Sequence, residues 1–75
     1  MHKTETKLKT VRKEKGLTQR GLAEATGISL RTLQHYEQGS KDLNMAAAIT
    51  VHAIAEALQV RMEELLDLTD QTKNQ

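Results

Sequence analysis

The chain of 75 residues contains no cysteine, proline, tryptophan or phenylalanine, and Tyr36 is its single aromatic residue. The lack of cysteine excludes a disulfide framework and a thiolate metal site, and it is typical of proteins in a reducing cytoplasm. No apolar run has the about 20 residues that a membrane span needs, and the start MHKTETKLKT is too polar for a secretory signal. A core limited to Leu, Ile, Val and Ala favours short packed helices. We expect one small, all-α, cytoplasmic domain.

The net charge is small, but the charged residues are unevenly distributed. The net charge is +1, yet residues 1–41 carry nine lysines or arginines and four acidic residues, whereas residues 42–75 carry two and six. A basic half of this kind predicts a polyanionic partner on its side of the molecule, although two ordinary solvated faces would give the same count. We interpret Lys3, Lys7 and Lys9 as general electrostatic attraction or a contribution to solubility.

The most informative segment spans residues 18–39, TQRGLAEATGISLRTLQHYEQG. Thr18 and Ser29 each precede a helical run and are good N-caps. Gly27 lies where a tight turn requires a positive φ, and Gly39 ends the second run. The segment therefore predicts a helix-turn-helix, whose second helix contacts DNA in the major groove. The two helices are expected over Gln19–Thr26 and Leu30–Gln38.

Three further helices complete the expected fold. The first spans about Thr6–Lys15 and ends at Gly16. Asn44 is the expected cap of a fourth helix over about Met45–Leu58, and a short fifth helix covers about Met62–Leu68. The inward stripe of the fourth helix has the spacing of an amphipathic helix and consists of Ala47, Val51, Ile54, Ala55 and Leu58.

These motifs together resemble the lambda-repressor/Cro-like helix-turn-helix family, the XRE type of bacterial and phage regulators. The residues that carry the resemblance lie between about positions 7 and 68, and the string from Thr18 to Gly39 is its most specific part. The resemblance implies a five-helix DNA-binding domain over residues 7–68, a polar arm over 1–6 and a disordered tail over 69–75. The residues that match are Leu8, Arg12, Gly16, Leu17, Thr18, Gln19, Leu22, Ala23, Gly27, Ile28, Ser29, Leu33, Tyr36, Glu37, Gly39, Ile54, Ala55, Leu58, Val60, Leu65 and Leu66.

The resemblance also assigns roles to individual positions. Arg12 and Glu37 match the family's structural salt bridge between the first helix and the end of the third. Arg31 has the fork of donors that matches guanine O6 and N7, and Leu30 suits a thymine methyl group. The expected base-contacting residues are Ser29, Leu30, Arg31, Thr32, Gln34 and His35. The expected phosphate contacts are Gln19, Gln38, Ser40 and Lys41.

Three positions depart from the family pattern and bear on stability. Gly21 stands where many relatives have Glu, so the second helix lacks a complete capping box. Gln59 replaces the glycine that usually closes the fourth helix, and Arg61 replaces a Ser or Thr cap of the fifth. None of the three belongs to the expected DNA-contacting set.

The leading functional hypothesis is a transcription regulator, a repressor, acting as a homodimer on a palindromic operator. Candidate dimer contacts are Leu65, Leu66 and Leu68. The alternative is that these leucines only close the core. A second hypothesis is a protein-interaction module of antitoxin or accessory-factor type, which would use the acidic C-terminal side. An enzyme is not expected, because paired carboxylates, a nucleophile–histidine set and a phosphate-binding glycine loop are all missing from the pattern. His2, His35 and His52 lack ligand spacing, so no metal or cofactor is expected.

Overall fold

The first three helices begin at residues whose side chains satisfy the free helix ends. In this computed structural model, which describes residues 6–66, α1 covers Lys7–Glu14, α2 Gln19–Thr26 and α3 Leu30–Gln38. Their N-caps are Thr6, Thr18 and Ser29, and each hydroxyl oxygen accepts a hydrogen bond from the backbone N–H three residues later. The bounds predicted for α2 and α3 are confirmed. α1 is one residue shorter at each end than predicted.

The segment that follows α3 differs from the prediction of one continuous helix. A 3₁₀ turn, η1, covers Leu43–Met45, and α4 covers only Ala48–Leu58. Between them, Ala46 and Ala47 have extended backbones, with ψ angles of 158° and 146°. The prediction of a helix that starts at Met45 is therefore wrong, because two extended residues separate η1 from α4.

The cap and the first inward residue predicted for this helix are wrong as well. Asn44 lies inside η1, where its backbone N–H donates to the Asp42 carboxylate at 3.0 Å. Ala47, predicted to face inward, is exposed and is itself the N-cap of α4, without a side-chain hydrogen bond. The rest of the predicted stripe is correct: Val51, Ile54, Ala55 and Leu58 are buried.

The count of five helices is not confirmed. A second 3₁₀ turn, η2, covers Met62–Glu64 in place of the predicted fifth helix, so residues 6–66 contain four α-helices and two 3₁₀ turns. The all-α class holds for these residues. Leu68, the expected tail over 69–75 and the first five residues of the expected arm lie outside the described range.

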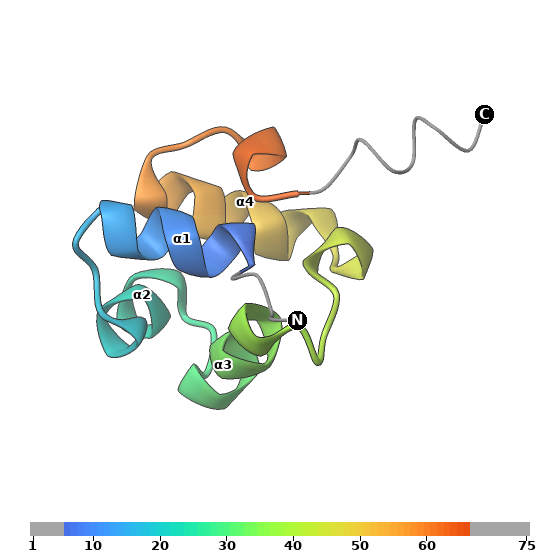
Figure 1. Cartoon of the computed structure of the whole chain (residues 1–75), viewed down its shortest axis with the longest axis horizontal. Helices are drawn as coiled ribbons and strands as arrows, with labels where there is room; N and C mark the ends of the chain where they lie inside the picture. Colours follow the sequence, from blue (N-terminus) through green and yellow to red (C-terminus); the bar gives the residue numbers. More distant parts are fainter. Residues whose placement is uncertain (1–5, 67–75) are drawn as a thin grey trace, which may run out of the picture.

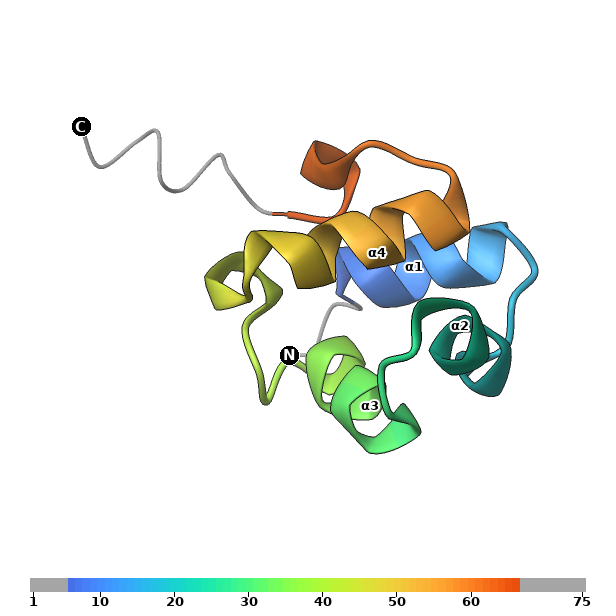
Figure 2. The same ribbon diagram turned by 180° about the vertical axis from the view of Figure 1, so that it is seen from behind.

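The core is built from leucines and smaller aliphatic residues of every helix. α4 contacts α2 and η2, and α3 contacts both α1 and α2. Figures 1 and 2 show the consequence: α3 lies along one edge of the molecule, opposite η2, with one side against the body. Within residues 6–66, none of the helices combines the length and hydrophobicity that crossing a membrane requires. The buried apolar side chains are Leu8, Leu22, Leu33, Leu43, Val51, Ile54, Ala55, Leu58 and Leu65.

Candidate nucleic-acid interface

A glycine turn sets the crossing of α2 and α3. Gly27 closes α2 with φ = 78°, a left-handed conformation that costs other residues free energy. Ser29 then begins α3 by accepting a hydrogen bond from the Thr32 N–H at 3.1 Å. Leu22 on α2 and Leu33 on α3 are both fully buried between the two helices and the body. The opposite side of α3 is left facing outward.

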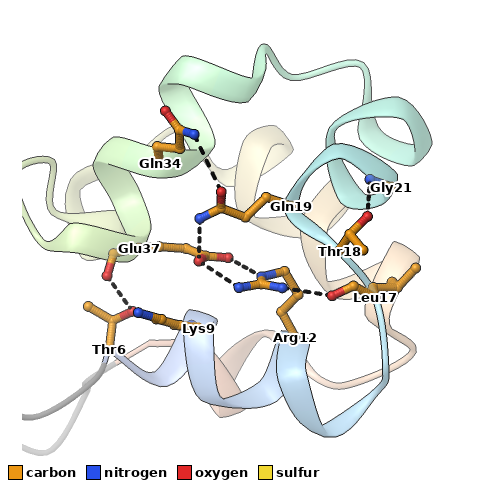
Figure 3. A network of polar contacts seen from close by, with 9 residues as sticks. All are labelled: Thr6, Lys9, Arg12, Leu17, Thr18, Gln19, Gly21, Gln34 and Glu37. Atoms are coloured by element: carbon orange, nitrogen blue, oxygen red, sulfur yellow. Dashed lines mark hydrogen bonds and ion pairs between the residues drawn. The ribbon is translucent and has the colours of Figure 1, made fainter.

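A buried ion pair fixes the end of α3 to α1. Figure 3 shows Arg12 and Glu37 facing each other, with Arg12 Nε 2.5 Å from Glu37 Oε2 and a second guanidinium nitrogen 3.1 Å from Oε1. Glu37 is only 4% exposed. The remaining guanidinium nitrogen donates to the Leu17 carbonyl at 2.7 Å. The carboxylate is therefore paired in the bidentate geometry that compensates the loss of hydration.

The same carboxylate organises two glutamines. Gln19 Nε2 donates to Glu37 Oε1 at 3.0 Å, and Gln34 Nε2 donates to Gln19 Oε1 at 3.4 Å (Figure 3). The side-chain amide of Gln19, which we expected to contact a phosphate, thus links Glu37 of the ion pair to Gln34 in the absence of DNA. Its second N–H hydrogen is left for another acceptor. Neither bridge was predicted, because both join residues at least 15 positions apart.

The outward side of α3 gathers most of the residues predicted to contact bases. One shallow depression is lined by five of its side chains. Arg31 is exposed there, and within the described part of the chain it has no hydrogen-bond or ion-pair partner. Its guanidinium is thus free to bind an acceptor. The lining side chains are Leu30, Arg31, Gln34, His35 and Gln38.

The hydroxyls at the start of α3 are partly engaged with each other. Ser29 Oγ donates to Thr32 Oγ1 at 2.9 Å while it accepts from the Thr32 backbone N–H. The Ser29 hydrogen is therefore used inside the helix, whereas the Thr32 hydroxyl keeps its own hydrogen. Of the two residues, Thr32 has the better donor for a base or a phosphate.

Ser40 and Lys41 differ in what they offer to DNA. Ser40 Oγ lies 3.0 Å from His35 Nδ1 and donates to the His35 carbonyl at 3.3 Å. Because Ser40 lies at Nδ1, Nε2 is the ring nitrogen that His35 has left for a base. Lys41 is exposed, as is Gln38. The contact between Ser40 and His35 was missed, although the glycine between them signals that the chain turns back there.

Lys7, one of the lysines interpreted as general electrostatic attraction, is hydrogen-bonded within the protein. Lys7 Nζ donates to the Leu66 carbonyl at 2.8 Å, which ties the start of α1 to the end of the described chain. Lys3 lies outside the described residues. Within residues 6–66 no group of three or more His, Asp or Glu side chains has the geometry of a metal site.

The two crossing helices, the glycine turn and the uncovered α3 define a helix-turn-helix DNA-binding domain. A comparison with protein-family models agrees, because the helix-turn-helix model matches residues 8–65. The chain belongs to the XRE, or lambda-repressor-like, family of helix-turn-helix proteins, which are DNA-binding transcription regulators. No curated protein matches the chain.

Proposed function

We propose that the protein is a sequence-specific repressor that binds a palindromic operator as a homodimer. The observation that carries this proposal is the free guanidinium of Arg31 on a helix held by the Arg12–Glu37 ion pair. A fixed helix with an unengaged fork of donors suits bidentate binding of guanine. One helix supplies few base contacts, so two copies would bind half-sites about 10–10.5 base pairs apart.

The neighbouring side chains have distinct roles in this proposal. Leu30 would pack on a thymine methyl group, and Thr32 would donate to a base edge or phosphate. His35 and Gln34, each held by a protein partner, would add weaker base contacts. Gln38 and Lys41, both exposed, would bind phosphates and set the register, assisted by Ser40 and the second N–H of Gln19.

Selection of bound sequences from a random pool of double-stranded DNA tests the proposal. Wild-type protein should enrich a two-fold symmetric sequence, and Arg31→Ala should lose the preference at one base position in each half-site. The expected loss is about 1–3 kcal/mol at that position. Arg20→Ala removes an equivalent exposed cation from α2 and is the matched control, with an unchanged base preference. An Arg31→Ala protein weakened equally on every sequence would make Arg31 a phosphate contact instead.

The alternative, a protein-interaction module, is favoured by one observation. Residues 42–75 carry six acidic residues against two basic ones, a composition that would suit a basic partner chain. The two functions differ in their salt dependence. A regulator with several phosphate contacts should lose DNA affinity steeply between low and physiological salt, whereas an interaction module should bind no DNA selectively at either.

A further inference from the structure

The start of α4 exposes apolar side chains that nothing in the described structure covers. Met45 is 80% exposed and Ile49 is 78% exposed, and they are the two large apolar residues so exposed within residues 6–66. Ala48, exposed as well, is the first residue of α4 and follows Met45 by three positions. We call these three residues the Met45–Ile49 patch. Contiguous exposed apolar surface is typical of a protein–protein contact.

Of the three leucines expected at a dimer contact, the two within the described residues, Leu65 and Leu66, pack in or against the core. Leu65 is 4% exposed and belongs to the core, and Leu66 is half-buried against it. Residues that already close the core of one copy have little apolar surface left for another. The Met45–Ile49 patch is thus the better candidate for contact between copies within the described part of the chain.

The position of the patch is compatible with binding by α3. In Figure 1, α3 lies along the lower edge, with α2 to one side and with η1 and the first turn of α4 to the other; Figure 2 shows the same order from behind. A second copy placed at the η1 side leaves the outer side of α3 uncovered. If a two-fold axis at the η1 side relates the two copies and runs toward the edge that carries α3, the α3 helices of both copies face the same side of the dimer.

The charges around the patch allow it to meet its own copy. The patch itself has no charged side chain. Lys41 and Asp42 precede it, and His52 and Glu56, with nitrogen and oxygen 3.6 Å apart, follow it on α4. Each flank contains one acidic residue and one basic or protonatable residue. Two copies related by a two-fold axis can therefore meet at the patch without placing like charges opposite each other. A strongly basic or acidic partner would find no complementary surface here.

We propose that the Met45–Ile49 patch is the contact between two copies of this chain, an inference that rests on the proposed homodimer. Stable interfaces bury about 800 Å² on each partner, more than three side chains of this size provide. The free protein therefore associates weakly. Two adjacent half-sites bring two copies together at high effective concentration, and the patch then converts two weak binding events into one cooperative event.

Cross-linking tests the contact without reference to DNA binding. Because the chain has no cysteine, Ile49→Cys introduces a single thiol, and oxidation at high micromolar concentration should give a covalent dimer. Ala25→Cys, at an exposed alanine of α2, is the matched control and should stay largely monomeric. Equal dimer yields from the two variants would overturn the proposal.

Cooperativity is tested with DNA selected by the wild-type protein. Ile49→Glu should bind a single half-site as wild type does, but should lose about tenfold or more of the affinity for two adjacent half-sites. Ala25→Glu should lose none of it. Cooperative binding retained by Ile49→Glu would overturn the proposed contact at the patch. The same holds if wild-type protein binds two adjacent half-sites as independent monomers. Absence of any selective DNA binding by wild type would instead remove the proposed function, with the cross-linking result still standing on its own.

Discussion

Residues 6–39 and residues 40–66 form helices of the same kind but hold their ends by different means. α1, α2 and α3 each begin at a hydroxyl that accepts a backbone N–H. α4 begins at Ala47 without a side-chain cap and ends at Gln59, which has φ = 60°. In the first region, the helix boundaries are therefore set by hydrogen bonds between residues only three positions apart. α4 lacks such a cap, and its stability depends on the apolar face that it buries.

The contrast matters for the proposed function because the well-capped region includes α3, the helix that we propose contacts DNA. The start of α3 is fixed by Ser29, and its end is fixed by Glu37 through Arg12 and Gln19. Base recognition requires such a helix to keep its position to within a fraction of an ångström. α4 has no such requirement, so it tolerates weak ends while Val51, Ile54 and Leu58 keep it in place.

The largest effect should come from Glu37→Ala, which breaks the anchoring of the first region. The substitution leaves Arg12, with 11% of its side chain exposed, without its carboxylate, and removes the acceptor of Gln19. We expect the free energy of unfolding to fall by about 3–5 kcal/mol, measured as the denaturant midpoint. Glu24→Ala, at an exposed position of α2, is the control and should change little. An unchanged midpoint for Glu37→Ala would remove the ion pair from this structural role.

Gln59→Gly should strengthen the weaker region by relieving its left-handed residue. Gln59 is the one residue other than glycine with a positive φ in the described range. Replacement by glycine removes the Cβ that disfavours this conformation, and we expect a gain of about 1 kcal/mol in thermal or denaturant unfolding. Gln59→Ala keeps the Cβ and should show no such gain. Equal stabilities of the two variants would contradict the backbone explanation.

Ala47→Ser should supply the cap that α4 lacks. The extended backbone of Ala47 already suits an N-cap, and the new hydroxyl would accept from the N–H of Ile49 or Thr50. We expect a gain of about 0.5–1 kcal/mol. Ala48→Ser adds the same hydroxyl one residue later, inside the helix, and serves as the control. If both serines lower the unfolding midpoint, capping does not limit this end of α4.

Gly21→Glu should have the smallest effect, within the region that is already well capped. A glutamate would complete the capping box by accepting the Thr18 N–H, and it would remove an interior glycine. A Cβ at this position would lie 3.1 Å from Thr18 Oγ1, close enough that the exposed hydroxyl must shift slightly. We therefore expect a net gain of only about 0.5 kcal/mol in the denaturant midpoint. Gly21→Ala separates the two effects, since it adds the Cβ without the carboxylate; a loss in both variants would show that the contact with Thr18 dominates.

Prediction from sequence was most accurate for the two helices of the glycine turn. The bounds of α2 and α3 were predicted to the residue, because Thr18, Gly27, Ser29 and Gly39 act on backbone groups only a few positions away. The start of α4 was predicted wrongly, because Asn44 is by residue type as good an N-cap as Thr18 or Ser29. The choice between capping a helix and lying inside η1 was made by the packing of this loop, in which Leu43 is buried.

The sequence by itself thus determined the helical class, the crossing pair of helices and the composition of the outer side of α3. Helical periodicity and capping are local properties, so they can be recognised in a single chain without its fold. Tertiary structure alone decided which side chains are free: it engaged Gln19 with Glu37, buried Leu65 and left Met45 and Ile49 exposed. Each of these outcomes depends on segments brought together through space, and local sequence does not specify that proximity.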